Sequence, residues 1–207
     1  WEKTTQYNLA LDFSFLKGRI NGTIEAYRSY TKDLLLTVTL PSVSGYSKTI
    51  GNVGETSNRG IDITLNSNIV ERGDFIWNLN ATAAWQKDRI ESLMNGKEDM
   101  VGNNWFIGQS IGVLYDYQKI GIWQDTPADQ EEMAKFNANG SQFAPGKIKV
   151  KDQNGDYRID GNYDRVIIGN TRPRWTVGLT STLSYKGIEL SAFLTGRLNY
   201  MRGIGQA

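Results

Sequence analysis

The chain has 207 residues, of which 39% are hydrophobic and 11% aromatic, and its 23 basic and 22 acidic residues leave a formal net charge of +1. This near-neutral balance gives no electrostatic support for a nucleic-acid partner. The chain contains no cysteine and no histidine, which excludes disulfide frameworks, thiolate nucleophiles and sites that need an imidazole. No apolar run reaches the roughly 18 residues of a membrane-spanning helix.

The first predicted element is a β-hairpin over about residues 5–30. Apolar and polar side chains alternate from Tyr7 to Phe15, and the alternation resumes at Ile20 after the dipeptide Lys17-Gly18. A period of two is typical of a strand whose two faces meet different environments. The short Gly-containing interruption indicates a tight turn.

Two more hairpins with the same pattern are predicted over about residues 59–88 and 174–199. The first turns near Gly73 and the second at Lys186-Gly187. Helical spacing occurs only around residues 129–137, where we expect an exposed helical segment of one or two turns. The sequence therefore predicts six antiparallel strands and very little helix.

The connections between these strands alternate between short turns and long segments, about 31–58 and 89–173. Soluble domains rarely contain irregular loops of such length. Outer-membrane barrels combine short periplasmic turns with long extracellular loops. The pattern favours an all-β fold, an antiparallel transmembrane β-barrel segment with long extracellular loops.

Aromatic residues also stand at the spacing that a membrane barrel requires. Phe75 and Trp85 are ten residues apart on one apolar strand face, as are Trp175 and Tyr185. Ten residues rise roughly 25 Å in a tilted strand, which is the height of the apolar band of such barrels. We predict that these four residues and Trp77 form the aromatic girdles at the membrane edges.

Six strands cannot close around an aqueous lumen, and an open sheet would leave unpaired edges in lipid. The chain is therefore expected to be a section of a larger barrel, or else a protomer of an oligomeric β-barrel pore. A third interpretation, from another class, is a soluble β-sandwich that binds glycans through its loop aromatics.

Several stretches resemble a known family in the order in which they occur. They are WEKTTQYNLALDF, RINGTIEAYRSYTKDLLL, GNVGETSNRGIDITLNS, FIWNLNATAAWQKDRIESL and GKIKVKDQNGDYRIDGNYDRVIIGNTRPRW. They are similar to the carboxy-terminal barrel of SusC/RagA-type, TonB-dependent outer-membrane transporters of Bacteroidetes. The resemblance spans nearly the whole chain.

The resemblance implies that residues 1–207 are part of one barrel domain, of 22 strands in the parent protein, in the outer membrane of a Gram-negative bacterium. The parent would carry an amino-terminal plug and a TonB box, which we expect to be absent from this chain. It would import an oligosaccharide or peptide, energised by TonB and capped by a SusD-like surface lipoprotein. Its outer surface would contact lipid and lipopolysaccharide, and no catalytic step or required cofactor is expected.

One loop carries a cluster of oxygen ligands at alternate positions, as calcium-binding loops do. Its members are Asp152, Asn154, Asp156, Asp160 and Asp164. Tyr157 stands where an EF-hand has glycine, and where the resembling family often has the second glycine of DVNGDG, and Tyr163 stands at the position of the bidentate Glu. The alternative is a turn whose side chains cap its own backbone without an ion.

Aromatic residues in the long connections are candidates for contact with cargo or with the partner lipoprotein. They are Tyr46, Trp105, Phe106, Tyr115, Tyr117 and Trp123. The alternative is that they pack the long loops on themselves. Carboxylate pairs such as Glu131 and Glu132 indicate no cleft, so the sequence predicts no catalytic residues.

Overall fold

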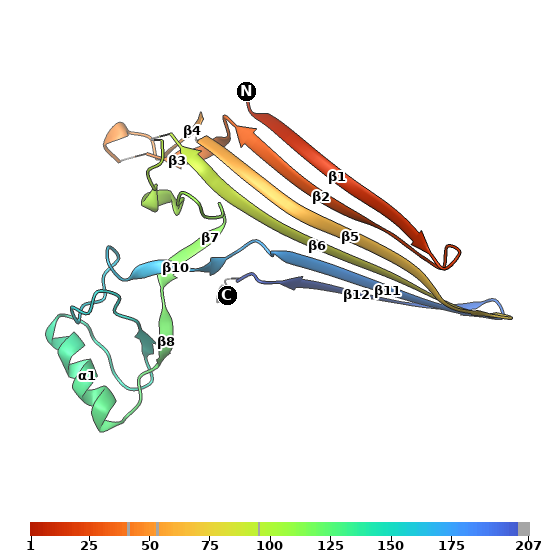
Figure 1. Cartoon of the computed structure of the whole chain (residues 1–207). Coiled ribbons are helices and arrows are strands. Elements are labelled where there is room, and N and C mark those ends of the chain that lie inside the picture. The colour runs from red at the N-terminus through yellow and green to blue at the C-terminus, as the bar shows by residue number, and fades with distance from the viewer. Residues whose placement is uncertain (41, 53, 95, 203–207) are drawn as a thin grey trace. The chain divides into compact units, whose positions relative to one another are not determined.

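The computed structural model describes residues 1–40, 42–52, 54–94 and 96–202. Six long strands form one antiparallel sheet, in the order β1-β2-β5-β6-β11-β12 (Figure 1). Their bounds are β1 Lys3–Phe15, β2 Ile20–Lys32, β5 Gly54–Arg72, β6 Phe75–Leu93, β11 Trp175–Tyr185 and β12 Ile188–Leu198. The three hairpins lie where the alternation predicted them, and the second is longer than expected at both open ends.

The long connections contain secondary structure of their own. In the first, β3 (Leu35–Thr39) pairs with β4 (Lys48–Asn52), and a short 3-10 helix, η1 (Ser42–Ser44), lies between them in sequence. The second begins with η2 (Val101–Asn103). It continues into β7 Val113–Tyr117, β8 Lys119–Ile122, α1 Pro127–Ala138, β9 Ile148–Val150 and β10 Arg165–Asn170.

The chain divides into two compact units, one of residues 1–112 with 170–207 and the other of residues 113–169. In the second unit β7 pairs with β10 and β8 pairs with β9. The predicted loop 89–173 is therefore not a single irregular connection, because it holds the end of β6 and a whole folded unit. No helix in the described ranges is long and apolar enough to cross a membrane.

The register of the six-stranded sheet separates apolar from polar side chains over its whole width. One row on the apolar face runs through Leu11, Ile24, Ile63, Ala83 and Val177. The adjacent row on the other face runs through Asp12, Thr23, Thr64 and Thr82. The whole sheet therefore has one apolar and one polar face, because the apolar side chains of every strand lie on the same side.

A β-bulge in β5 keeps this separation intact near the short turn. The register between β5 and β6 shifts between Asn68 and Val70, so Ile69 is the extra residue and Val70 lies opposite Trp77. Strict alternation along β5 would have placed Ile69 on the apolar face, and the bulge gives that position to Val70. A single inserted residue reverses the alternation of the residues after it.

The carboxy-terminal end of β6 carries a small apolar cluster on the polar side of the sheet. Ile90 and Leu93 are buried, and Met100, Trp105, Ile107 and Ile111 pack against them. The carboxylate of Asp88 accepts hydrogen bonds from the Ser110 hydroxyl at 2.6 Å and the Ile111 backbone N–H at 3.1 Å. The segment after η2 is thereby fixed to β6.

The unit of residues 113–169 has its own core, built around α1. Trp123, Met133 and Phe136 are buried, with Phe143 and Ile159 packed against them. The helix has a Thr126 N-cap that accepts from the Asp129 N–H. The helix is longer than the one or two turns predicted around 129–137, and it is exposed except on one face. Met133 and Phe136 are three residues apart and so share one face, which the core covers.

A lysine connects this core to the charged face of α1. Lys149 Nζ lies 4.0 Å from the centroid of the Trp123 ring and forms ion pairs with Asp129 at 3.2 Å and Glu132 at 2.5 Å. The backbone N–H of Gln124, and then Lys149, lower the pKa of the Asp129 carboxyl. The stabilisation that accompanies this lowered pKa is fully present above the ordinary aspartate pKa, and it is lost as the pH falls through the lower folded-state value.

We expect Lys149→Ala to loosen α1, because it removes both ion pairs and the cation over Trp123. In the full-length protein, hydrogen exchange of the α1 amides should accelerate by about tenfold. The matched control is Lys151→Ala, whose side chain is exposed. Equal exchange in the two variants would contradict a stabilising role for Lys149.

Candidate functional site

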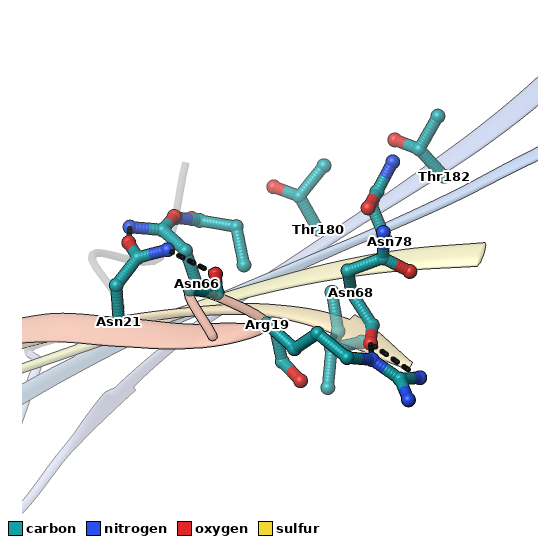
Figure 2. A pocket seen from close by; sticks show the side chains of 11 residues that line it. Arg19, Asn21, Asn66, Asn68, Asn78, Thr180 and Thr182 are labelled. Atoms are coloured by element: carbon teal, nitrogen blue, oxygen red, sulfur yellow. Dashed lines mark hydrogen bonds between the residues drawn. The ribbon is translucent and has the colours of Figure 1, made fainter. Parts of the chain in front are cut away.

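The polar face of the sheet is hollowed near its short turns (Figure 2). The hollow has a volume of about 280 Å³ and is lined mainly by amide and hydroxyl side chains. The polar residues of the lining are Arg19, Asn21, Asn66, Ser67, Asn68, Asn78, Asn80, Thr180 and Thr182. They come from β2, β5, β6 and β11 and the turn before β2, so cross-strand register alone brings them together.

Three asparagines form a ladder across the hollow. Asn21 lies opposite Asn66, and Asn66 lies opposite Asn80. The Asn80 amide donates to Asn66 Oδ1 at 2.5 Å, and the Asn66 amide donates to Asn21 Oδ1 at 3.2 Å. Figure 2 shows Asn21 and Asn66 joined in this way. Each bond fixes an amide orientation, so the ladder presents a defined set of donors and acceptors.

Arg19 closes the end of the hollow at the bulge in β5. Its guanidinium donates to the backbone oxygens of Asn68, at 3.2 Å, and of Ile69, at 2.8 Å. The Asn68 amide donates to Glu71 at 2.8 Å. Asn68 Oδ1 is shielded from solvent and has no hydrogen-bond partner within the described ranges, which leaves one acceptor of the hollow unused.

This surface can form many hydrogen bonds and carries little charge. None of its lining residues is Asp or Glu, and the one cation among them is occupied by backbone carbonyls. Amides and hydroxyls both donate and accept, which matches sugar hydroxyls and peptide groups equally. The alternation in the sequence indicated polar strand faces but did not identify this site, because only the register between strands aligns the asparagines.

The predicted girdle residues meet across β6 and β11. Trp85 lies opposite Trp175, and Phe75 lies opposite Tyr185. Trp77 stands two residues inside the second pair, and its Nε1 donates to Ser181 Oγ at 3.0 Å. The two rows are thus ten residues apart on both strands, as the sequence spacing required. Their role at the membrane edges stays a prediction.

Two of the predicted contact aromatics are in the interior. Trp123 is 1% exposed and Phe106 is 9% exposed. Contact of these rings with cargo or partner is therefore corrected to packing within the fold, the alternative that the sequence left open. For Trp123 the reason is plain, because it forms the core of residues 113–169 with Met133 and Phe136.

The other four aromatics have different surroundings. Trp105 packs against Ile90 and Leu93. Tyr115 and Tyr117 lie on β7, and the Arg165 guanidinium stands 4.6 Å from the Tyr115 ring centroid. Tyr46 is 75% exposed and follows η1. Its contact with cargo or partner stays a prediction, as does that of Tyr115 and Tyr117.

The acidic loop satisfies its own backbone. Asp152 accepts from the N–H groups of Gly155 at 2.7 Å and Tyr157 at 2.8 Å. Asp164 is fully buried and accepts from Gln153 at 2.9 Å and Asp160 at 2.8 Å. Further bonds run to Asp156 from Arg158, to Asp160 from Asn162 and Tyr163, and to Asn154 from Asp156.

The loop departs from the family that it resembles at Tyr157, which replaces a glycine. Its φ of 58° lies in the left-handed region, which costs a non-glycine residue roughly 1–2 kcal/mol. The ring packs on Phe136, with centroids 5.5 Å apart in an edge-on arrangement, and Lys135 Nζ lies 5.7 Å from its centroid. Packing against α1 offsets the backbone strain that a glycine would avoid.

These hydrogen bonds favour the self-capped interpretation over a calcium site. Within the described ranges, no group of three or more Asp, Glu, His or Cys residues is arranged to hold a metal ion. At least one side-chain oxygen of each of these residues already accepts a backbone N–H group. Calcium binding at Asp152, Asn154, Asp156, Asp160 and Asp164 stays a prediction, which calorimetric titration of the full-length protein with calcium tests.

We expect Asp164→Asn to destabilise the loop by about 1–3 kcal/mol, because the amide group would direct its own N–H toward one of two buried donors. Hydrogen exchange over residues 150–165 in the full-length protein measures this loss. Asp156→Asn is the control, since that side chain is exposed in the same loop. Similar exchange in both variants would show that Asp164 is not the anchor.

Comparison with known proteins identifies the family to which the chain belongs. The family described as "TonB dependent receptor-like, beta-barrel" matches residues 1–205. TonB-dependent receptor P26 of Formosa agariphila is 31% identical over 207 residues, and TonB-dependent receptor SusC of Bacteroides thetaiotaomicron is 30% identical over 215 residues. These alignments cover 95% and 96% of this chain but only 20% of each relative. The chain thus spans about a fifth of the length of these relatives.

The fold is also that of a solved transporter. The RagAB peptide transporter structure matches with a TM-score of 0.71 at 22% identity, covering 96% of this chain and 21% of that one. The predicted barrel-segment fold and the resemblance to SusC/RagA-type proteins are confirmed, and neither the sandwich nor the oligomeric pore is favoured. The chain belongs to the TonB-dependent receptor β-barrel family.

Proposed function

We propose that the full-length protein imports an oligosaccharide or a peptide across the outer membrane in a TonB-dependent manner, and that this chain supplies six strands of its barrel wall. The observation that carries the proposal is the two-faced sheet. Its apolar rows suit lipid, and the polar rows and the hollow between Arg19 and Thr182 suit a hydrated lumen. No catalytic step is part of the proposal.

The relatives support both the class of activity and the choice of cargo. One is named SusC and described as a TonB-dependent receptor, and another is described as a peptide transporter. The neutral amides and hydroxyls of the hollow can serve sugar hydroxyls or peptide groups. Both cargo classes therefore belong to the proposal.

The proposed partners are a SusD-like surface lipoprotein and TonB. The lipoprotein would meet the side that carries the long connections, where Tyr46 is exposed. TonB would act through parts of the parent protein outside this chain. Lipid and lipopolysaccharide would surround the apolar face, with the Trp85–Trp175 and Phe75–Tyr185 pairs at the membrane edges.

Leu179→Lys tests which face meets lipid. Leu179 lies midway along β11 on the apolar face, between Ala81 and Leu194. A lysine there should cost about 2–4 kcal/mol in urea unfolding of the full-length protein in lipid vesicles. Thr64→Lys, on the polar face, is the control and should cost about 1 kcal/mol or less. The proposed orientation is wrong if Thr64→Lys is the more damaging change.

The double variant Asn66→Ala, Asn80→Ala tests the hollow in transport. Removing two amides from the ladder should lower uptake of the cargo by roughly three- to tenfold at equal protein level in the outer membrane. Cells carrying the full-length protein would be offered labelled oligosaccharides and labelled peptides separately, which also identifies the cargo class. Asn162→Ala, an exposed asparagine outside the sheet, is the control. Unchanged uptake in the double variant would show that the hollow takes no part in transport.

A further inference from the structure

Three cationic residues stand side by side across β2, β5 and β6. Arg28 lies directly opposite Arg59, and Arg59 lies directly opposite Lys87. Like charges in directly opposite positions destabilise a sheet. Such a row indicates that an anion is present where the protein works.

The row belongs to the apolar, outward face of the sheet. The adjacent row on that face runs through Ala26, Ile61 and Trp85. Because side chains alternate along a strand, residues two positions farther along point to the same side. Arg28, Arg59 and Lys87 are each two positions beyond a member of that row, so they share its face.

The row also lies just outside the aromatic band. Trp85 and Trp175 are the predicted girdle pair nearer the long connections. Two further residues correspond to roughly 5 Å along the barrel axis at about 3.3 Å per residue and a tilt near 40°. The long connections of outer-membrane barrels are extracellular. The cations therefore stand at the headgroup level of the outer leaflet.

The surrounding side chains offset only part of this charge. Within the described ranges, no carboxylate forms an ion pair with Arg28, Arg59 or Lys87. The nearby acid, Glu91, is engaged by Arg89 at 3.7 Å and by the Ser57 hydroxyl at 2.6 Å. These six residues and Gly108 line a hollow of about 120 Å³.

Two of the cations lie over aromatic rings. The Arg28 guanidinium lies 4.8 Å from the Tyr30 ring centroid, and the Arg59 guanidinium lies 6.0 Å from that of Trp85. A guanidinium that lies over the face of a ring can still use its N–H donors to bind an anion. Paired donors of this kind match phosphate oxygens, which arginine binds in a bidentate manner.

We propose that Arg28, Arg59 and Lys87 bind the phosphate group of a lipid in the outer leaflet. A lipid fits because the cations lie on the apolar face of the sheet. Acyl chains can lie along the apolar rows of that face while the phosphate contacts the cations. The inference rests on the proposed placement of the sheet in the outer membrane.

Native mass spectrometry of the detergent-solubilised full-length protein tests the inference. The probes are bisphosphoryl lipid A, chemically dephosphorylated lipid A and inorganic phosphate. The wild type should retain bisphosphoryl lipid A and bind the dephosphorylated form at least tenfold more weakly. The triple variant Arg28→Gln, Arg59→Gln, Lys87→Gln should lose at least tenfold in affinity for bisphosphoryl lipid A.

The matched control removes three cations from the short-turn end by Lys17→Gln, Arg72→Gln and Lys186→Gln, and it should bind as the wild type does. Full binding by the Arg28 triple variant, or equal binding of dephosphorylated lipid A, would overturn the inference. Binding of inorganic phosphate as tight as that of the lipid would overturn the assignment to a lipid.

Heat-dependent gel mobility shows whether each variant is a folded barrel. Where the triple variant does not fold, Arg59→Gln alone should still weaken binding of bisphosphoryl lipid A by several-fold, and unchanged binding would count against the site. A folded protein that transports cargo but does not prefer bisphosphoryl lipid A over the dephosphorylated form would contradict this inference alone. A wild-type protein that does not insert into membranes defeats the proposed placement as well.

Discussion

The pairing of β6 with β11 is the interaction on which the rest of this sheet depends. It joins segments separated by about 80 residues in sequence, with Trp85 opposite Trp175 and Phe75 opposite Tyr185. Backbone groups inside a bilayer need hydrogen-bond partners within the protein, so a strand there must pair along its full apolar length. A slip by one residue would send Leu179 and Leu183 to the polar side and break both aromatic pairs.

In the proposed barrel, one set of strands therefore faces two different environments. On the polar face the asparagine ladder offers neutral donors and acceptors, which in the proposed function would bind a passing solute without the strong attraction of a fixed charge. On the apolar face Arg28, Arg59 and Lys87 concentrate charge beyond the aromatic band. The alternation of side chains keeps these surfaces separate although both are built from β2, β5 and β6.

The sequence was sufficient for the hairpins because period-two alternation and short Gly-containing turns are local signals. It was not sufficient for residues 113–169, where Trp123 and Phe136 become core residues only through contacts made by the folded unit. The bulge at Ile69 could not be predicted for a related reason, since a bulge is defined by pairing with the partner strand. The asparagine ladder and the cation row share this origin, because each depends on register between strands and neither leaves a motif along the chain.

Alternating solvent exposure along β11 is the most direct test of the central claim that this sheet is a barrel wall with lipid on one face and water on the other. Single cysteines at positions 177–184, spin-labelled in the full-length protein in lipid vesicles, would be probed with oxygen and with a water-soluble nickel complex. The account predicts that oxygen accessibility peaks at the positions of Val177, Leu179 and Leu183, and that nickel accessibility peaks at those of Thr180, Thr182 and Ser184. Equal accessibility at all positions, or the opposite phase, would contradict it.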